Sequence, residues 1–265
     1  MTVNSLRKLS PDTRLRKIRQ ILLNKQRVDI AELAESFSVS EITVRRDLEK
    51  LEQHGLLQRT IGGAIPAERM AFDFNFAQRR QTRQKEKQAI AREAFKVIQP
   101  GHRLILDTGT TTLELAYLLK DLRDVTVITP SLAVASVLQF SRNVQTILLG
   151  GIFRQGSADL TGSVTENNLD MFAVDIVFQG ADGIGLDGTL YNADLRLARV
   201  DQKMRQRAAS TYILADSTKI GQTALVTNGY LQQVDALITD EKIEPEHEKT
   251  FREIGATVVP VAIQR

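Results

Sequence analysis

Residues 29–53 contain the feature that most limits the fold of this chain: two short helical patterns separated by only three residues. In the first pattern, Asp29 precedes four apolar residues at helical spacing: Ile30, Leu33, Ala34 and Phe37. In the second, Ser40 is a favourable N-cap, and three apolar residues share one face: Val44, Leu48 and Leu51. The spacer Ser38-Val39-Ser40 is too short to be a loop with a structure of its own. An earlier amphipathic segment with Leu15, Ile18, Ile21 and Leu22 would complete a three-helix core.

The polar side of the second pattern carries the residues expected of a DNA-reading helix. In a helix-turn-helix, the early residues of the second helix face base edges, and nearby Arg and Lys side chains hold phosphates. A strand pattern over residues 56–61, followed by Gly62-Gly63, predicts a hairpin wing with Arg59 at the DNA backbone or minor groove. The predicted DNA-binding residues are Ser40, Glu41, Thr43, Arg45, Arg46, Lys50 and Arg59. Taken alone, the pattern also fits a solvated face of an ordinary α-rich domain.

The charge of the chain is unevenly distributed. Residues 1–92 contain 19 Lys and Arg against 11 Asp and Glu, a net charge of +8. Residues 93–265 contain 16 against 21, a net charge of −5. A basic N-terminal part and an acidic C-terminal part predict a polyanion-binding domain joined to a domain with another function. Affinity that comes from phosphate contacts is expected to fall steeply with salt.

Composition excludes several other functions. The 265 residues suffice for about two domains, and 42% hydrophobic and 25% charged residues are ordinary for a soluble protein. The absence of cysteine excludes disulfides, Cys-ligated zinc and iron–sulfur sites. His54, His102 and His247 are far apart, which disfavours a metal site. Without an apolar run of 18 residues or an apolar signal core, we expect a cytoplasmic protein with no membrane span and no cofactor.

The segment after the wing changes character. Phe72, Phe74 and Phe76 alternate with polar residues, and a run rich in Arg, Gln and Lys follows up to Lys87. We expect an extended connector whose aromatic residues anchor it, and which carries a signal, supports a dimer or serves as a plain tether. The predicted domains are residues 1–66, a winged helix-turn-helix; residues 67–88, a linker; and residues 89–265, an α/β domain.

From Ile90 onward, strand and helix patterns alternate. Seven apolar strands are predicted, over residues 103–107, 125–129, 145–149, 176–179, 211–214, 236–239 and 257–259. Repeated βα units with near-continuous apolar strands predict a doubly wound parallel sheet covered on both faces. Ligands of such sheets bind at the carboxyl ends of the strands, and the polar residues of this domain gather there.

The strand ends predict a pocket for a phosphorylated sugar. The turn Gly109-Thr110-Thr111-Thr112 leads into a helix whose N–H groups and dipole favour a phosphate. Lys203 and Lys219 are candidates to add positive charge, and Asp182 to bind sugar hydroxyls. The predicted effector-binding residues are Asp107, Gly109, Thr110, Thr111, Thr112, Thr129, Ser131, Gly151, Asp182, Lys203, Asp216 and Lys219. A Thr-rich turn is also a common helix start, but five polar strand ends in one sheet favour a ligand site.

With both halves considered, residues 14–240 resemble the DeoR family of bacterial regulators of sugar metabolism. The N-terminal similarity lies in Leu33-Ala34, Val39-Ser40, Thr43-Val44-Arg45-Arg46-Asp47-Leu48, Leu51-Glu52 and Gly62-Gly63-Ala64. Glu86-Lys87 and Ile90-Ala91 fit the family's pattern after the linker. The C-terminal similarity runs through Leu106-Asp107-Thr108-Gly109-Thr110-Thr111, Gly150-Gly151, Gly180-Ala181-Asp182-Gly183-Ile184, Lys203-Met204 and Ala215-Asp216-Ser217-Thr218-Lys219. This second domain is in turn similar to ribose-5-phosphate isomerases.

The resemblance implies a transcriptional regulator, a repressor or activator of a carbohydrate operon, whose affinity for double-stranded operator DNA responds to a phosphorylated sugar. Because helix-turn-helix proteins read two half-sites, we expect a homo-oligomer, a dimer or a tetramer. Two alternatives remain. One is a phosphosugar isomerase with Asp182, Asp194 or Asp201 as its base; the other is a plain oligomerisation platform with a vestigial pocket.

Three positions depart from the patterns of these families. Ile61 stands where the family usually has His, which removes a phosphate contact of the wing. Pro130 stands where it usually has Asn, which removes a side-chain amide and a backbone donor and would narrow or change the effector. Gln202 precedes Lys203 where the isomerases carry Glu, and their Gly-rich stretch is missing. The third departure argues against catalysis.

Overall fold

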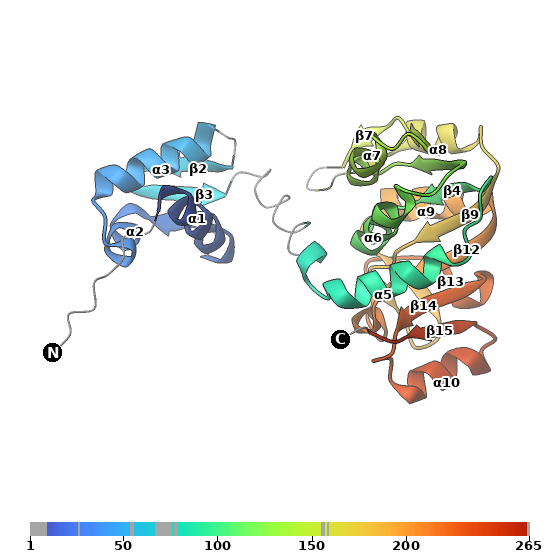
Figure 1. Cartoon of the computed structure of the whole chain (residues 1–265). Helices are drawn as coiled ribbons and strands as arrows, with labels where there is room; N and C mark the ends of the chain where they lie inside the picture. The colour runs from blue at the N-terminus through green and yellow to red at the C-terminus, as the bar shows by residue number, and fades with distance from the viewer. Residues whose placement is uncertain are drawn as a thin grey trace. The chain divides into compact units, whose positions relative to one another are not determined.

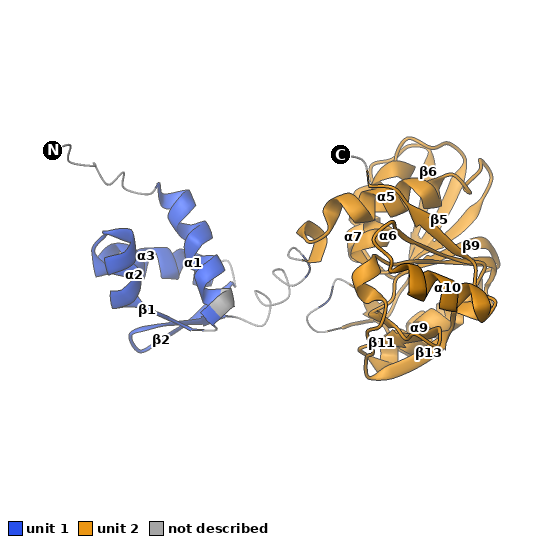
Figure 2. Cartoon of the chain, turned by 90° about the horizontal axis from the view of Figure 1, so that it is seen from below, with its two compact units in different colours: residues 1–78, 155–157 blue, residues 79–154, 158–265 orange. Residues whose placement is uncertain are grey.

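The chain divides into two compact units. The computed structural model describes residues 10–25, 27–53, 56–66, 76, 79–154, 157 and 159–263. Unit 1 contains residues 1–78 and 155–157, and unit 2 contains residues 79–154 and 158–265 (Figure 2). Unit 2 therefore begins inside the segment predicted as a linker. His54, Phe72 and Phe74 lie outside the described residues.

Unit 1 is the predicted winged helix-turn-helix (Figure 1). Its elements are α1 (Pro11–Lys25), β1 (Val28–Asp29), α2 (Ile30–Phe37), α3 (Glu41–Gln53), β2 (Leu57–Thr60) and β3 (Gly63–Pro66). The Asp29 carboxylate caps α2 by accepting the N–H of Ala31 at 2.8 Å. The apolar residues predicted for the three helices form one buried core. The three strands pair in the order β1-β3-β2.

The wing depends on two adjacent glycines. Gly62 has a φ of +87°, which side-chain-bearing residues rarely adopt. Gly63 lies between β1 and β2, and a Cβ at this position would be 1.9 Å from the carbonyl oxygen of Val28. The pair therefore allows β3 to turn sharply and then approach β1 closely.

Unit 2 is built on a seven-stranded sheet, whose strands pair in the order β15-β14-β12-β9-β4-β5-β6 with every pair parallel. These strands are β4 (Arg103–Leu106), β5 (Val125–Thr129), β6 (Val144–Leu148), β9 (Val174–Gln179), β12 (Ala208–Leu214), β14 (Ala236–Asp240) and β15 (Val258–Val261). All seven predicted strands are present. The predicted doubly wound α/β class is confirmed.

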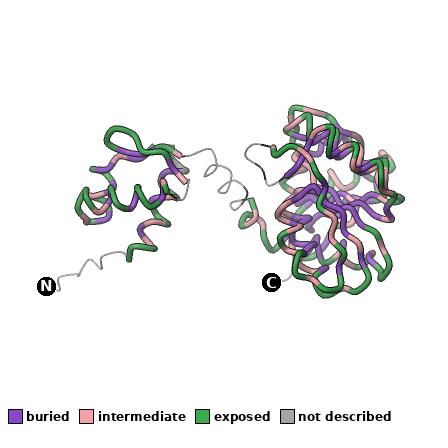
Figure 3. The backbone as a smooth tube through the Cα atoms, turned by 90° about the horizontal axis from the view of Figure 1, so that it is seen from above, coloured by how far each residue is buried: buried purple, intermediate pink, exposed green. Residues whose placement is uncertain are grey.

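Helices cover both faces of this sheet. They are α5 (Gln84–Phe95), α6 (Thr110–Leu119), α7 (Leu132–Leu138), α8 (Ser163–Leu169), α9 (Leu195–Gln206) and α10 (Pro245–Glu253). The first three pack beside one another, while α8 and α9 share an apolar core with β4 and β9 on the other side (Figure 1). Figure 3 shows the buried strands running through the middle of unit 2.

Two small sheets were not predicted. One is antiparallel, in the order β10-β11-β13, and contains β10 (Gly183–Ile184), β11 (Thr189–Asn192) and β13 (Val226–Tyr230). The other is a hairpin of β7 (Ile152–Phe153) and β8 (Leu160–Thr161). Both follow strand ends of the main sheet and so surround the predicted pocket.

The expectation of an extended connector up to Lys87 is wrong for its described part. Residues 79–81 are helical, and α5 begins at Gln84. The physical reason is that one face of this segment is apolar and packed: Ala89, Ile90, Ala91 and Ala94 are buried. Of the Lys residues in the preceding run, Lys85 is exposed on α5 and Lys87 is buried.

Candidate functional site

The start of α3 is held by two hydroxyl groups. The Oγ of Ser40 accepts the N–H of Thr43 at 3.3 Å, and it lies 2.9 Å from the Oγ1 of Thr43. Ser40 is therefore the predicted N-cap, and the preceding Ser38 has a φ of +53°, which makes the turn between the helices. Both predicted hydroxyls support the helix end that a major-groove reader would present.

The predicted DNA-binding residues of α3 lie on the side of the helix away from its buried residues; four are exposed and Thr43 is half-buried. We call this surface the recognition face: Glu41, Thr43, Arg45, Arg46 and Lys50. Arg45 and Glu41 form an ion pair at 3.3 Å in which both side chains are more than half exposed. Such a pair contributes little stability and opens easily. Ile42, which was not predicted, is 64% exposed beside the recognition face.

A buried ion pair fixes α3 against α1. The guanidinium of Arg14 donates to both carboxylate oxygens of Asp47, at 3.1 Å from its Nη2 to Oδ1 and through a second bond from Nε to Oδ2. Both residues are less than a tenth exposed. The hydrogen bond to Asp47 raises the pKa of Arg14 above its usual value. This pair orients the recognition face, and it was missed because Asp47 lies in a polar stretch that reads as exposed.

The wing is tied to α3 through Arg59. Arg59 donates its Nε to Glu52 at 2.7 Å, and its backbone N–H donates to the same carboxylate at 3.0 Å. These donors lower the pKa of Glu52 below its usual range. Ile61 is fully exposed at the turn. Arg59 therefore braces the wing on α3, and its contact with DNA stays a prediction.

The second candidate site begins where the strand order of the main sheet reverses. The chain winds outward from β4 through β5 to β6, and from β9 through β12 to β14 on the other side. Ligands of open α/β sheets bind at such a switch point. Here Asp107 follows β4, Gly180 follows β9, and the Asp107 Oδ2 accepts the Gly180 N–H at 3.0 Å. The Asp107 Oδ1 is buried and has no hydrogen-bond partner within the described part of the chain.

The environment of Asp107 favours its protonated form. The residue is 4% exposed, and burial raises its pKa, while donation by the Gly180 N–H opposes that rise. A protonated carboxyl group can accept a hydrogen bond from a hydroxyl group or donate one through its own proton. Either bond suits a polyhydroxylated ligand.

The Thr-rich turn forms the first turn of α6. Gly109 is its N-cap, and no described side chain caps this helix end. The Thr112 hydroxyl donates to the backbone carbonyls of Gly109 and Asp107, at 2.8 and 3.0 Å. Thr112 is thus an internal support. Thr110 and Thr111 remain at the helix end, where the N–H groups and the helix dipole attract an anion.

Three other predicted residues hold the loops in place. The Thr129 hydroxyl donates to the Leu106 carbonyl at 2.7 Å and accepts the Ser131 N–H at 3.0 Å. The Ser131 hydroxyl caps α7. Gly151 lies against α8, where a Cβ would be 2.0 Å from the Oγ1 of Thr165. The carbonyl of Pro130 accepts the Leu160 N–H at 3.0 Å. The loop therefore keeps a backbone hydrogen bond although proline stands where the family usually has Asn.

An arginine at the strand ends was missed. Arg154, in the loop after β7, donates to Asp159 through Nε at 2.9 Å and Nη2 at 2.6 Å. Asp159 is fully buried, and its β-bridge to Ser131 places it beside the loop after β5. The negative charge of Asp182 helps to raise the pKa of Arg154. The Oδ2 of Asp182 accepts the Ala193 N–H at 2.8 Å. Arg154 thus brings a positive charge to this end of the sheet.

The two predicted lysines lie in different places. Lys219 ends the short helix η1 (Ser217–Lys219) after β12, and Asp216 caps that helix by accepting the Thr218 N–H at 3.1 Å. Lys203, in contrast, forms an ion pair with Asp170 at 2.6 Å. α9 runs back toward the beginning of β12. Its last turn therefore lies at the amino ends of the strands, whereas the pocket is predicted at their carboxyl ends. The prediction that brought Lys203 to the pocket is therefore not supported.

A second buried carboxyl lies behind the site. Asp201 is 1% exposed, and its Oδ2 accepts the amide groups of Asn192 at 2.8 Å and Asn228 at 3.2 Å. Burial raises its pKa well above the usual value, and the nearby charge of Asp107 adds to the rise. The two buried carboxyls therefore influence each other's protonation.

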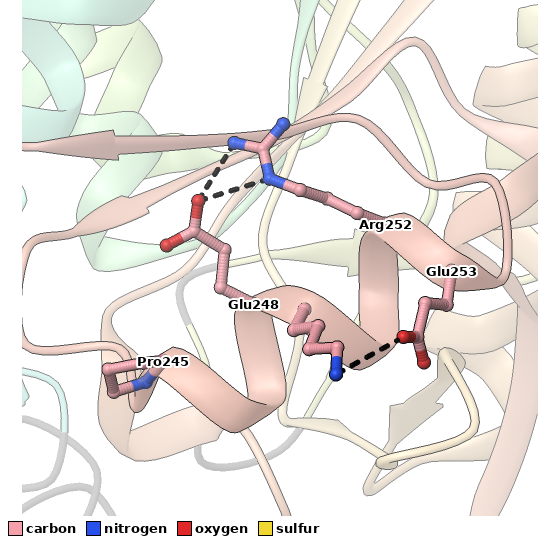
Figure 4. A pocket seen from close by; sticks show the side chains of 5 residues that line it. Pro245, Glu248, Arg252 and Glu253 are labelled. Atoms are coloured by element: carbon pink, nitrogen blue, oxygen red, sulfur yellow. Dashed lines mark hydrogen bonds and ion pairs between the residues drawn. The ribbon is translucent and has the colours of Figure 1, made fainter.

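A further surface feature lies on α10. A hollow of about 430 Å³ on α10 is lined by Pro245, Glu248, Lys249, Arg252 and Glu253. Figure 4 shows that its charged side chains pair along the helix, Arg252 with Glu248 and Lys249 with Glu253. Within the described residues, no group of three His, Asp or Glu side chains is suited to a metal ion. No helix among them is long and apolar enough to cross a membrane.

The fold and the two sites together define a DNA-binding domain joined to an α/β ligand-sensing domain. Residues 14–69 match the DeoR-like helix-turn-helix domain, and residues 82–241 match the DeoR C terminal sensor domain. The chain belongs to the DeoR family of transcriptional regulators, as its sequence resemblance predicted.

Similar proteins cover nearly the whole chain. It is 34% identical over 251 residues to the HTH-type transcriptional regulator YulB of Bacillus subtilis (strain 168), with 94% of this chain and 97% of that protein covered. It is 32% identical to the glycerol-3-phosphate regulon repressor of Escherichia coli (strain K12), covering 80% and 84%. It is 31% identical to the lactose phosphotransferase system repressor of Lactococcus lactis subsp. lactis, covering 90% and 94%.

Solved structures resemble part of the chain only weakly. A D-ribose-5-phosphate isomerase in complex with phospho-erythronic acid is 20% identical, with a TM-score of 0.39, and covers 51% of this chain and 52% of its own. The assignment of the fold therefore rests on the strand order of unit 2 and on the family match.

Proposed function

We propose that this protein is the repressor of a carbohydrate-utilisation operon, and that a phosphorylated sugar bound at the strand ends of unit 2 changes its affinity for operator DNA. The observation that carries the proposal is the switch-point site, where Asp107 and the start of α6 lie together in a chain that also has a recognition face. The names of the glycerol-3-phosphate and lactose system repressors support the class of effector. The protein acts in the cytoplasm, where its operator is.

The site offers complementary groups for the two parts of a sugar phosphate. The N–H groups at Thr110 and Thr111 suit the phosphate, since the helix dipole adds to their donation. The buried Oδ1 of Asp107 and the half-buried Asp182 suit hydroxyl groups. Lys219, after β12, and Arg154, after β7, supply positive charge from two different loops.

On the DNA side, Arg45 and Arg46 are the proposed principal contacts, with Lys50 on the phosphates. Ile42 is a further contact, because an exposed apolar side chain at the head of a recognition helix can meet a thymine methyl group. Ser40 and Thr43 act mainly by holding the helix end, and Arg59 by bracing the wing.

The protein works as a homo-oligomer in this proposal, because two recognition helices are needed for two half-sites. A hollow of about 670 Å³ lies between α7 and the edge strand β6, and its eight lining residues are uncharged: Leu132, Ala135, Ser136, Leu138, Gln139, Val144, Thr146 and Leu148. In a two-fold contact each residue meets the same surface of the second copy, so an uncharged face avoids like-charge repulsion. Leu148→Lys should lower the mass measured by light scattering, and Leu225→Lys, at an exposed site elsewhere, should not.

Two measurements test the proposal. A mobility-shift assay compares the protein on its own upstream region and on random DNA, and a thermal-shift screen follows with sugar phosphates. A sugar phosphate that raises the melting temperature and changes the DNA shift supports the regulator. Equal binding to both DNAs, or no response to any sugar phosphate, contradicts it.

The isomerase alternative receives less support from the carboxylates. Asp201 is enclosed by two asparagine amides, and Asp194 caps α9 and binds Arg196 at 3.0 Å. Asp182 is tied to the Ala193 N–H. A base must reach the proton that it removes, and these three groups serve as structural acceptors. Turnover of a pentose or hexose phosphate in a coupled assay would restore the alternative.

A further inference from the structure

A hollow of about 400 Å³ lies between α5 and α6, two helices that pack side by side (Figure 1). This volume is in the range of sites for small molecules. Three polar side chains of α5 line it at intervals of four residues, Gln84, Gln88 and Arg92, so they form one row along the hollow. Its described lining contains none of the predicted effector-binding residues. The hollow therefore differs from the switch-point site in the residues that form it.

The side of the hollow formed by α6 carries a buried carboxyl group. Glu114 lines the hollow, is 7% exposed, and its Oε1 accepts no hydrogen bond within the described part of the chain. The Arg80 Nε lies 4.0 Å from this oxygen, which is too far for a hydrogen bond. Because a buried acceptor without a partner costs free energy, a ligand that donates to Glu114 would bind favourably there.

Two cations near Glu114 are bonded to other groups. The Arg80 Nη2 donates to the Tyr117 hydroxyl at 2.8 Å, and its guanidinium lies 5.0 Å from the centre of the Tyr117 ring. Burial lowers the pKa of Lys87 and the charge of Glu114 opposes this effect, but the Lys87 Nζ donates to two backbone carbonyls. Neither side chain therefore supplies the hydrogen bond that Glu114 lacks.

The charges of the hollow favour a ligand with one negative charge. Arg80 and Arg92 line it together with Glu114, so two cations accompany one carboxylate. The Arg92 side chain is exposed and forms no hydrogen bond or ion pair with the described residues. A guanidinium binds a carboxylate through two parallel, charge-assisted hydrogen bonds. A phosphate group carries nearly two negative charges at pH 7, and Glu114 would repel it more strongly than a carboxylate.

From this combination we propose that the hollow between α5 and α6 is a second ligand site, and that its ligand is a small carboxylic acid with hydroxyl groups. The carboxylate of the ligand pairs with Arg92, and one of its hydroxyl groups donates to the Oε1 of Glu114. Gln84 and Gln88 offer amide groups to the remaining hydroxyl groups. Unit 2 therefore recognises two kinds of molecule, at two different sites.

The test uses the full-length protein and calorimetric titration. Glycerate and D-gluconate are the probes, because both are small carboxylic acids with hydroxyl groups. Hexanoate keeps the carbon chain and the carboxylate of gluconate without its hydroxyl groups, and sorbitol keeps hydroxyl groups without the carboxylate. Two variants, Glu114→Met and Arg92→Met, each remove one proposed contact. Their matched controls are Glu253→Met and Arg123→Met, at exposed positions outside the hollow.

Binding is expected to need both ends of the ligand. Glycerate or gluconate binds the wild type, whereas the affinities of hexanoate and sorbitol are lower by about tenfold or more, since each lacks one of the two contacts. Glu114→Met and Arg92→Met each lower the affinity for the hydroxy acid by a similar factor, and both control variants retain it. Asp107→Asn also retains it, because Asp107 belongs to the switch-point site.

The second site is overturned if neither hydroxy acid binds, if hexanoate or sorbitol binds equally well, or if Glu114→Met keeps the wild-type affinity. Displacement of the hydroxy acid by inorganic phosphate at equal concentration would overturn the choice of a carboxylate. If the affinity falls in Asp107→Asn but not in Glu114→Met, the hydroxy acid occupies the switch-point site, so the second site fails and the proposed function does not. Should Glu114→Met not fold, Arg92→Met decides, because its side chain is exposed.

Discussion

The Asp107 Oδ2 accepts the backbone N–H of Gly180 at 3.0 Å, and this hydrogen bond joins the ends of β4 and β9, the two strands between which the sheet order reverses. One oxygen of the carboxyl group is therefore structural. The other is buried, lacks a partner in the described part of the chain, and lies where a ligand of this fold class binds. Asp107 thus links the architecture of unit 2 to its proposed effector.

Replacing Asp107 separates these two roles. Asp107→Asn keeps an oxygen for the Gly180 N–H and changes the other atom to an amide, while Asp107→Ala removes both. We expect both variants to lose sugar-phosphate affinity by about tenfold or more, the effect of one hydrogen bond to a charged or polar ligand group. Calorimetric titration measures this loss, and the melting temperature of the Asn variant should stay near that of the wild type. Wild-type affinity in the Ala variant would show that Asp107 does not contact the ligand.

Arg46 is the residue of the recognition face whose removal is expected to weaken DNA binding most. Arg46→Ala should also reduce the slope of log affinity against log salt by about 0.9 if the guanidinium neutralises one phosphate. If it reads a base instead, the loss is about 1–3 kcal/mol on the operator and less on random DNA. Lys249→Ala is the control, because it removes one positive charge from an exposed site on α10 in unit 2. Equal losses in both variants would mean that only net charge matters.

The Arg14–Asp47 pair predicts a stability effect in unit 1. Asp47→Ala leaves the Arg14 guanidinium buried without its carboxylate, which should destabilise unit 1 by about 3–5 kcal/mol. Hydrogen exchange of α3 in the full-length protein measures the effect. Glu49→Ala, two residues along and exposed, should change little. The double variant Arg14→Met with Asp47→Leu should recover most of the loss, since an apolar pair leaves no buried charge. If hydrogen exchange of α3 in Asp47→Ala is as slow as in the wild type, the ion pair does not hold α3.

The sequence predicted the helix-turn-helix well because its determinants are local. Ser40 caps the helix that it immediately precedes, and the buried face of α3 follows from helical spacing alone. The partner of Asp47 could not be predicted in this way, since Arg14 lies 33 residues earlier and only folding brings the two together.

The effector site was predicted in outline but not in detail. Asp107 and the Thr-rich turn follow from the rule that ligands bind where parallel strands end. Lys203 was placed there as a candidate to add positive charge, yet it lies near the C-terminal end of a helix, and such ends lie where strands begin. Arg154 was missed because it sits in a loop between the two strands of a small hairpin. The position of Lys203 follows from the alternation of strands and helices, whereas that of Arg154 depends on how its loop folds over the strand ends.

Asp201 predicts how the stability of unit 2 changes with pH. Its pKa is raised well above the value of about 3.9 that it has in an unfolded chain. Between these two values the unfolded state has released its proton and the folded state retains it. Rising pH therefore favours unfolding, by up to about 1.4 kcal/mol per pH unit, until the folded pKa is passed. Denaturant titrations from pH 4 upward should show this fall, and Asp201→Asn, which keeps an acceptor for the two amides, should show a smaller one.

Asp175 provides the control, because its shift has the opposite sign. Hydrogen bonds from Arg103 lower its pKa to about 2, so its contribution to stability is complete above its unfolded pKa and is lost only as the pH falls toward 2. Asp175→Asn should therefore lower the stability of unit 2 by the same amount at every pH above 5. Its pH profile there should run parallel to that of the wild type, whereas the Asp201→Asn profile should be flatter. If Asp201→Asn also runs parallel, the buried carboxyl is ionised in the folded protein, and its hydrogen bonds outweigh its burial.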